Sequence, residues 1–139
     1  MATLPDAARA LFDAAEFVTL ATVQPDGQPQ LSVVWVERDG DDLLMSTTTN
    51  RQKHRNLARD PRASVLLYPK DNPYSYVEVR GNVTMTEEGG RELIDRLNQK
   101  YMGTPRYTWD DGTDKDTGNN GDGSISIANR LLWAKTTLL

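Results

Sequence analysis

Apolar and polar residues alternate in short runs along most of the chain, and turn residues separate these runs. Such alternation is typical of half-buried strands. Two of the separating turns contain an Asp-Gly pair, Asp26-Gly27 and Asp39-Gly40, which favours tight antiparallel hairpins. The pattern predicts strands at residues 17–23, 30–38, 42–48, 63–68 and 74–86, and a closing strand or strands at 124–127 and 131–136.

Three further segments have helical spacing of their apolar residues or helical start and stop signals, and we expect helices at 5–16, 51–59 and 87–102. Pro5 suits the first turn of the first helix. The second contains few apolar residues and ends at Asp60-Pro61, which predicts a short helix on the surface. Thr86 can cap the third helix through its hydroxyl group.

These elements give about six strands in meander order with three peripheral helices, in a single domain over residues 1–139. Six strands in a chain of this length usually close into a small barrel, because closure removes exposed strand edges. We therefore expect a mainly β fold, a six-stranded antiparallel split barrel with about three short helices. An open α+β sheet is the alternative. Gly81 within the strand at 74–86 predicts a bulge or a close backbone approach.

Composition argues against several functions. Twenty acidic and 16 basic residues give a net charge of −4, which argues against general nucleic-acid binding. The chain has no cysteine and one histidine, His54, so thiol chemistry and multi-histidine zinc or iron centres are excluded and no metal site is expected. No apolar run approaches the length of a transmembrane helix, and residues 1–10 do not have the pattern of a signal peptide. We expect a cytoplasmic protein without a membrane partner.

Residues 46–62, STTTNRQKHRNLARDPR, have a charge opposite to that of the whole chain. Five cations and one acid, Asp60, give the segment a charge of +4. If Thr49 or Asn50 caps the second helix, the first backbone N–H groups of this helix lack partners within it. These donors, the positive end of the helix and its cationic side chains favour a phosphate group. A solvated surface helix with no specific ligand is the alternative.

Three segments resemble a known family: FVTLATVQPDGQPQLSVVWVERDG at 17–40, LLMSTTTNRQKHRNLARDPRASVLL at 43–67 and YVEVRGNVTM at 76–85. They are similar to the pyridoxamine 5'-phosphate oxidase-like split β-barrel family, and within it to the deazaflavin-dependent oxidoreductases. The similarity covers most of residues 17–86.

The resemblance implies a homodimer with a flavin or deazaflavin in a groove between subunits. By position in the motif, the residues implied to bind the cofactor phosphate are Ser46, Thr47, Thr48, Arg51 and Lys53. Those implied to flank the ring are Ser32, Val33, Val34 and Trp35. Arg80 and Gly81 correspond to an Arg-Gly pair that borders the groove. Trp35 has a second interpretation, as a core or dimer-interface residue.

Two cofactors are compatible with this segment. FMN has one terminal phosphate, which residues 46–53 could bind alone. Coenzyme F-420 adds a phospholactate and an oligoglutamate tail, and Arg55 and Arg59, one and two turns beyond Arg51, could extend the basic track. The sequence of residues 51–62 is more similar to that of the deazaflavin branch, so the resemblance favours coenzyme F-420, with FMN as the alternative.

The activity implied by the resemblance is hydride transfer between the cofactor and a small organic substrate, with the chemistry supplied by the cofactor. No protein acid or base is identified, so a protein that carries a flavin-like cofactor without turnover is the alternative outside the enzymes. Oxidation of pyridoxamine phosphate is not expected. The arginine-bearing C-terminal segment of those oxidases has no counterpart here, and residues 125–139 contain only two cations, Arg130 and Lys135.

Two other features of the sequence, an acidic segment and the single histidine, are not assigned a function. Residues 111–123 are rich in acids, but Ile125 stands twelfth from Asp114, where a calcium-binding EF-hand requires glutamate. We expect a mobile acidic loop. His54 lies between Lys53 and Arg55 and is expected to be a surface residue rather than a proton shuttle.

Overall fold

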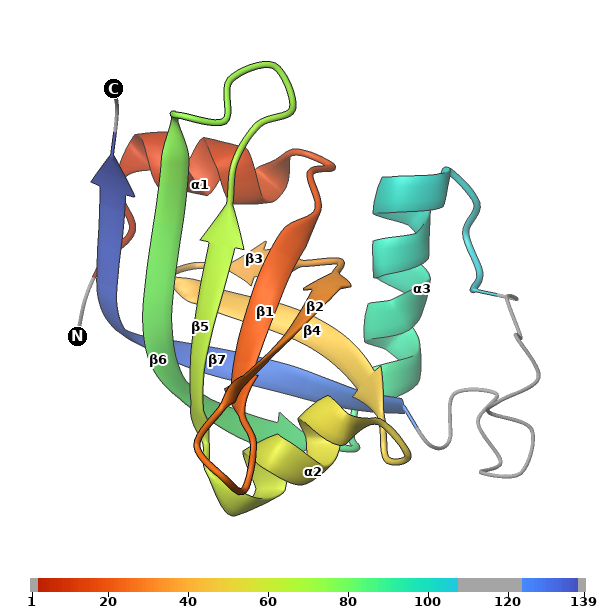
Figure 1. Cartoon of the computed structure of the whole chain (residues 1–139). Helices are drawn as coiled ribbons and strands as arrows, with labels where there is room; N and C mark the ends of the chain where they lie inside the picture. Colours follow the sequence, from red (N-terminus) through yellow and green to blue (C-terminus); the bar gives the residue numbers. More distant parts are fainter. Residues whose placement is uncertain (1–2, 108–123, 138–139) are drawn as a thin grey trace.

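The computed structural model describes residues 3–107, and residues 124–137 as backbone, and this part contains seven strands and three helices (Figure 1). The predicted acidic loop at 111–123 lies outside the described residues. The helices are α1 (Asp6–Asp13), α2 (Gln52–Arg59) and α3 (Gly90–Met102). The strands are β1 (Val18–Val23), β2 (Pro29–Val34), β3 (Glu37–Asp39), β4 (Asp42–Thr48), β5 (Arg62–Leu67), β6 (Tyr76–Thr86) and β7 (Ser124–Thr137).

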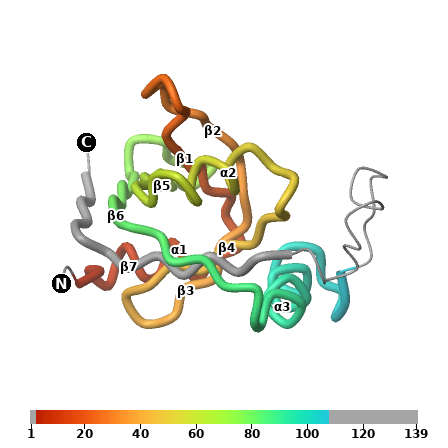
Figure 2. The backbone as a smooth tube through the Cα atoms, turned by 90° about the horizontal axis from the view of Figure 1, so that it is seen from below, coloured from red at the N-terminus to blue at the C-terminus, as the bar shows by residue number. Residues whose placement is uncertain are grey.

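All seven strands belong to one antiparallel sheet, in the order β2-β1-β5-β6-β7-β4-β3. β2 and β3 form its two edges, yet only Trp35 and Val36 separate them along the chain. Three Cα–Cα steps reach at most about 11 Å. The sheet therefore curls until its two edges come near each other at this point (Figure 2).

The predicted closed barrel of six strands is not confirmed, because β2 and β3 are not paired with each other in the described sheet. The predicted strand at 30–38 is interrupted at Trp35-Val36, where the chain leaves β1 and begins to pair with β4. The two predicted closing segments are one strand, β7, which pairs with both β6 and β4. The mainly antiparallel β fold with three helices is confirmed.

Both predicted hairpins are confirmed: β1 pairs with β2, and β3 with β4, each across an Asp-Gly turn. Gly27 and Gly40 have φ values of 89° and 62°, which a residue without a Cβ atom adopts most easily. The predicted irregularity at Gly81 is also confirmed, since the register between β6 and β7 shifts between Arg80 and Gly81.

The hydrophobic core lies inside the curl and is built from alternate residues of the strands. In β4, Leu43, Met45 and Thr47 are buried and the residues between them face the other way. α1 adds Ala8 and Phe12, both completely buried. α1 lies across one end of the curled sheet, α2 across the other end, and α3 beside β4 (Figure 1). Each end of the sheet is therefore covered by a short helix.

The helices begin and end a few residues from their predicted limits. α3 begins at Gly90 rather than 87, and its N-cap is Gly89 with φ of 82°. The hydroxyl group of Thr86 accepts a hydrogen bond from the backbone N–H of Glu88 (3.2 Å), so it closes a turn ahead of the helix. The prediction that Thr86 caps α3 is therefore wrong. Among the helices of the described residues, none is both long and apolar enough to cross a membrane.

Candidate functional site

The start of α2 lies directly after β4 and differs from the prediction. Arg51 is the N-cap, with an extended backbone and no side-chain capping bond, and its N–H donates to the carbonyl of Thr48 (3.1 Å). The condition considered from the sequence, a cap at Thr49 or Asn50, is therefore not met. The hydroxyl of Thr48 instead donates to the side chain of Asn50. Arg51 is thereby held at the point where the positive end of the helix meets the end of β4.

The structure brings together Lys53 of α2 and Ser32 of β2, which are 21 residues apart in sequence. The ammonium Nζ of Lys53 donates to Ser32 Oγ at 3.2 Å, and both residues are half-buried. Burial lowers the pKa of Lys53, and the neighbouring positive charge of Arg51 lowers it further. No carboxylate among residues 3–107 pairs with Lys53. A half-buried cation beside a second cation is stabilised when an anion binds between them.

The three predicted hydroxyl groups of β4 do not face one way. Thr47 points into the core with 5% of its surface exposed, and its Oγ1 has no hydrogen-bond partner among the described residues. Ser46 and Thr48 alternate with it and face the opposite side of the strand. A single phosphate therefore contacts either Thr47 or the pair Ser46 and Thr48, unless the ligand reaches around the end of the strand.

Alternation also separates the predicted residues of β2. Ser32 and Val34 face inward, toward the side covered by α2, while the side chain of Val33 is on the outer face. Trp35 follows β2 and lies against two tyrosines: its ring stacks on Tyr101 and meets the edge of Tyr107. Trp35 is thus part of an aromatic cluster with α3 and the segment after it.

Arg55 and Arg59 bind other parts of the protein. Arg55 donates to the carbonyl of Asn50 (2.9 Å) and to Gln52 Oε1 (2.7 Å). Arg59 donates to the carbonyl of Val23 at the end of β1. Both guanidinium groups thus support the ends of α2, although both side chains are exposed.

Arg80 and Gly81 lie elsewhere in the sheet. They belong to β6, and β1 and β5 stand between this strand and β2. Neighbouring strands are about 4.8 Å apart, so roughly 14 Å separates β6 from β2 along the sheet. Arg80 is exposed and forms an ion pair with Glu78 (3.1 Å). Within one chain, Arg80 and Gly81 are not part of the cluster formed by Arg51, Lys53 and Ser32.

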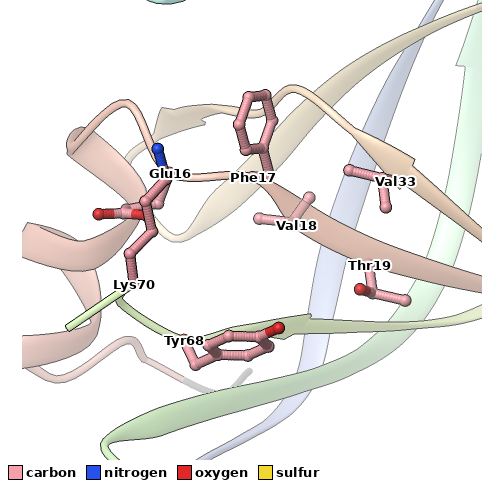
Figure 3. Close-up of a pocket in the computed structure, with 7 residues that line it drawn as sticks. All are labelled: Glu16, Phe17, Val18, Thr19, Val33, Tyr68 and Lys70. Carbon is pink, nitrogen blue, oxygen red and sulfur yellow. The ribbon is translucent and has the colours of Figure 1, made fainter. Parts of the chain in front are cut away.

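A pocket on the outer face of the sheet was not predicted. It lies between the start of β1, β2 and the end of β5 (Figure 3), and is lined by Glu16, Phe17, Val18, Thr19, Val33, Tyr68 and Lys70. The ammonium of Lys70 lies 5.5 Å from the centre of the Phe17 ring. The sequence did contain a signal. Phe17 alternates with the buried Val18 and Leu20, which places its ring on the outer face.

Comparisons with known proteins identify the family of the chain and support its fold. The family model for pyridoxamine 5'-phosphate oxidase matches residues 4–119. An F-420 reductase of known structure is 29% identical, with a TM-score of 0.80 over 95% of this chain and 98% of its own. A conserved hypothetical protein from Mycobacterium tuberculosis is 25% identical, with a TM-score of 0.72 over 96% of this chain and 84% of its own.

General stress protein 26 from Bacillus anthracis is 18% identical and shares the fold, with a TM-score of 0.65 over 93% of this chain and 89% of its own. The family match extends from the residues before α1 to beyond α3 and thus includes the segment around Arg51 and Lys53. The chain therefore belongs to the pyridoxamine 5'-phosphate oxidase family.

Proposed function

We propose that the protein is an oxidoreductase that binds coenzyme F-420 and transfers a hydride between this cofactor and a small organic substrate. The observation that carries the proposal is the half-buried ammonium of Lys53, which lies beside Arg51 and has only the neutral hydroxyl of Ser32 as its partner among the described residues. Membership of the family and the 29% identity to an F-420 reductase support the cofactor class.

The residues present fit a phosphorylated cofactor. Arg51 and Lys53 hold the phosphate, and the buried hydroxyl of Thr47 offers a further donor. β2 pairs only with β1 in the described sheet, so backbone groups of Ser32 to Val34 on its free edge are available to a planar ring. A bound deazaflavin supplies a carbon centre that accepts or gives a hydride. The chain binds and orients the ring, and the pocket beside Val33 (Figure 3) receives the substrate.

We further propose that two copies associate through the outer face of β2, β1 and β5. Leu31 and Val33 of β2 are 63% and 68% exposed. Thr19 pairs with both Val33 and Leu66, so these three side chains form a row across the three strands. Apolar sheet faces of this kind are usually covered by a partner. A second copy placed here would enclose the pocket between subunits.

FMN is the second candidate, and one observation favours it. The guanidinium groups of Arg55 and Arg59 are hydrogen-bonded to backbone carbonyls of Asn50 and Val23. In this arrangement Arg55 and Arg59 are bonded to the protein itself, and the ammonium of Lys53 faces a neutral hydroxyl, which suits a cofactor with one phosphate. Binding of coenzyme F-420 through an anionic tail would require Arg55 or Arg59 to exchange these bonds for the tail.

Fluorescence titration of the purified protein with coenzyme F-420 and with FMN tests the proposal. Lys53→Met should weaken binding of the preferred cofactor by about tenfold or more, because a charged hydrogen bond to phosphate is lost. Arg106→Met is the matched control, since it removes the same charge from an exposed site after α3. Tighter binding of FMN would replace F-420 by FMN in the proposal, and binding of neither cofactor would overturn it. Turnover with quinones or enones separates an enzyme from a carrier.

A further inference from the structure

α2 rests on the sheet with very little apolar contact. Leu57 is its one buried apolar side chain, with 3% of its surface exposed, and the other buried residue is Asn56, with no exposed surface. Apolar contact is not directional, so a single leucine holds the helix to the sheet without fixing its rotation or its position along the strands. If Lys53 is to contact a particular residue of β2, hydrogen bonds must fix the rotation of α2 and its position along the strands.

A continuous chain of hydrogen bonds lies under the helix. The amide Nδ2 of Asn56 donates to Thr22 Oγ1 (3.0 Å), and the hydroxyl of Thr22 donates to Gln30 Oε1 (2.8 Å). On the other side, Gln52 Nε2 donates to Asn56 Oδ1 (2.9 Å). The chain thus joins α2 to β1 and β2. Thr22 and Asn56 are both buried, so breaking one link leaves a buried polar group without its partner.

This chain and the contact between Lys53 and Ser32 attach the same two elements at two points. Lys53 and Asn56 are three positions apart in α2 and share a helix face. Ser32 and Gln30 are two positions apart in β2 and share a strand face. Two directional attachments between one helix face and one strand face fix both the rotation and the translation of the helix.

We propose that Asn56 is a positioning residue: its hydrogen bonds to Thr22 and Gln52 hold α2 in the register at which Lys53 meets Ser32. Asn56 does not itself touch the ligand in this role. The consequence for cofactor binding rests on the proposed function, whereas the placement of Lys53 does not.

Two pairs of variants test this role. Asn56→Leu removes the polar groups and keeps the number and branching of the side-chain heavy atoms, and Thr22→Val replaces only the hydroxyl in the middle of the chain. Asn98→Leu and Thr104→Val are matched controls. Asn98 is a buried asparagine of α3 whose Nδ2 donates to Thr104 Oγ1 (2.6 Å), on a helix that carries none of the proposed phosphate ligands. Thr104 is exposed and Asn98 also donates to two backbone carbonyls, so Thr104→Val controls only for the loss of a hydroxyl that bonds an asparagine. The other three variants should lower the stability of the protein, so stability alone does not decide.

The deciding measurement is the titration of the Lys53 amine, followed by NMR in protein labelled at the ε carbon of lysine and assigned with Lys53→Arg. In the unsubstituted protein, burial and Arg51 hold the pKa of Lys53 below its ordinary value. Asn56→Leu and Thr22→Val should return it toward 10.5, the ordinary value for lysine. The two controls should leave it unchanged. An unchanged Lys53 titration in both folded test variants would overturn the positioning role.

Cofactor titration of the same proteins separates this inference from the proposed function. Thr22→Val should weaken binding of coenzyme F-420 or FMN by about tenfold, and should have no further effect when Lys53→Met is already present, because both changes act through the same contact. If the unsubstituted protein binds neither cofactor, the proposed function fails, and the Lys53 titration still decides the role of Asn56. If binding is found and the losses from Thr22→Val and Lys53→Met simply add, Asn56 does not act through Lys53.

Discussion

The ring of Tyr101 lies parallel to the indole ring of Trp35, with centroids 5.2 Å apart and an interplanar angle of 6°. The ring of Phe17 also stacks on Tyr101, with centroids 5.8 Å apart and an interplanar angle of 26°. The phenol oxygen accepts a hydrogen bond from the backbone N–H of Val36 (3.1 Å) and donates to the carbonyl of Glu16 (2.7 Å). Tyr101 therefore ties the end of α3 to the link between β2 and β3 and to the segment that leads into β1.

Removing this hydroxyl group should destabilise the protein. In Tyr101→Phe the stacked rings remain, but the N–H of Val36 and the carbonyl of Glu16 lose a half-buried partner. We expect the free energy of unfolding, measured by urea denaturation, to fall by about 1–3 kcal/mol. Tyr74→Phe is the control, since Tyr74 is 62% exposed, and its effect should lie within about 0.5 kcal/mol. Equal effects of the two substitutions would contradict the assigned role of Tyr101.

The sequence predicted the parts of the fold that depend on turn residues and glycines. It did not predict the point at which a strand changes the neighbouring strand with which it pairs. The two Asp-Gly turns and the glycine in β6 gave the hairpins and the bulge correctly. The break at Trp35-Val36 had no signal in the pattern. Val34 and Val36 are both buried, so the alternation of inward residues continues through the point where the chain leaves β1 for β4. Alternation of apolar residues identifies the buried face of a strand, but it does not identify the neighbouring strand in the sheet.

The candidate site shows a similar division. The charge of residues 46–62 identified the segment that holds Arg51 and Lys53, and alternation in β4 alone would have separated Thr47 from its two neighbours. The burial of Asn56 was not predictable, because an asparagine in a helix of charged residues has the pattern of a solvated surface. Its place depends on Thr22, 34 positions earlier in the chain. Tertiary contacts of this kind leave no periodic signal.

The carboxyl group of Asp60 should titrate far below its usual range. Hydrogen bonds from the side chain and backbone of Arg62 hold the pKa of Asp60 at about 2, against an ordinary value of 3.8. Because this pKa is lower in the folded state, the contribution to stability is complete above pH 3.8 and is lost as the pH falls through about 2. In Arg62→Gln, NMR titration should show the pKa of Asp60 returning toward 3.8. Arg9→Gln removes an arginine bonded to Asp41 and should leave Asp60 unchanged.

A charge on the outer face of β2 should prevent association. We expect the unsubstituted protein to be a dimer by sedimentation equilibrium, and Val33→Glu to be a folded monomer, because two buried carboxylates would face an apolar surface. Met102→Glu is the control: Met102 is 62% exposed, belongs to α3 and is part of none of the three strands that form this face. A dimer that tolerates Val33→Glu would place the interface elsewhere, and a monomeric unsubstituted protein would contradict the proposed association.

As the pH rises, binding of a phosphorylated cofactor should begin to weaken at a lower pH than it would with a lysine of ordinary pKa. Lys53 binds an anion as the ammonium ion, and its pKa in the free protein is lowered by burial and by Arg51. Once the pH exceeds this pKa, the amine must take up a proton to bind, so affinity should fall by up to about tenfold per pH unit until the pKa of the complex is reached. The stability of the free protein depends on pH in the opposite direction. Between the lowered pKa of Lys53 and 10.5, the unfolded chain binds the proton more tightly than the folded protein does, so the free energy of unfolding should rise with pH.

Lys53→Arg keeps its charge throughout this range and should abolish the pH dependence of cofactor binding. Cofactor affinity measured by fluorescence from pH 7 to 10 checks this, and an equal decline in Lys53→Arg would show that another group controls it.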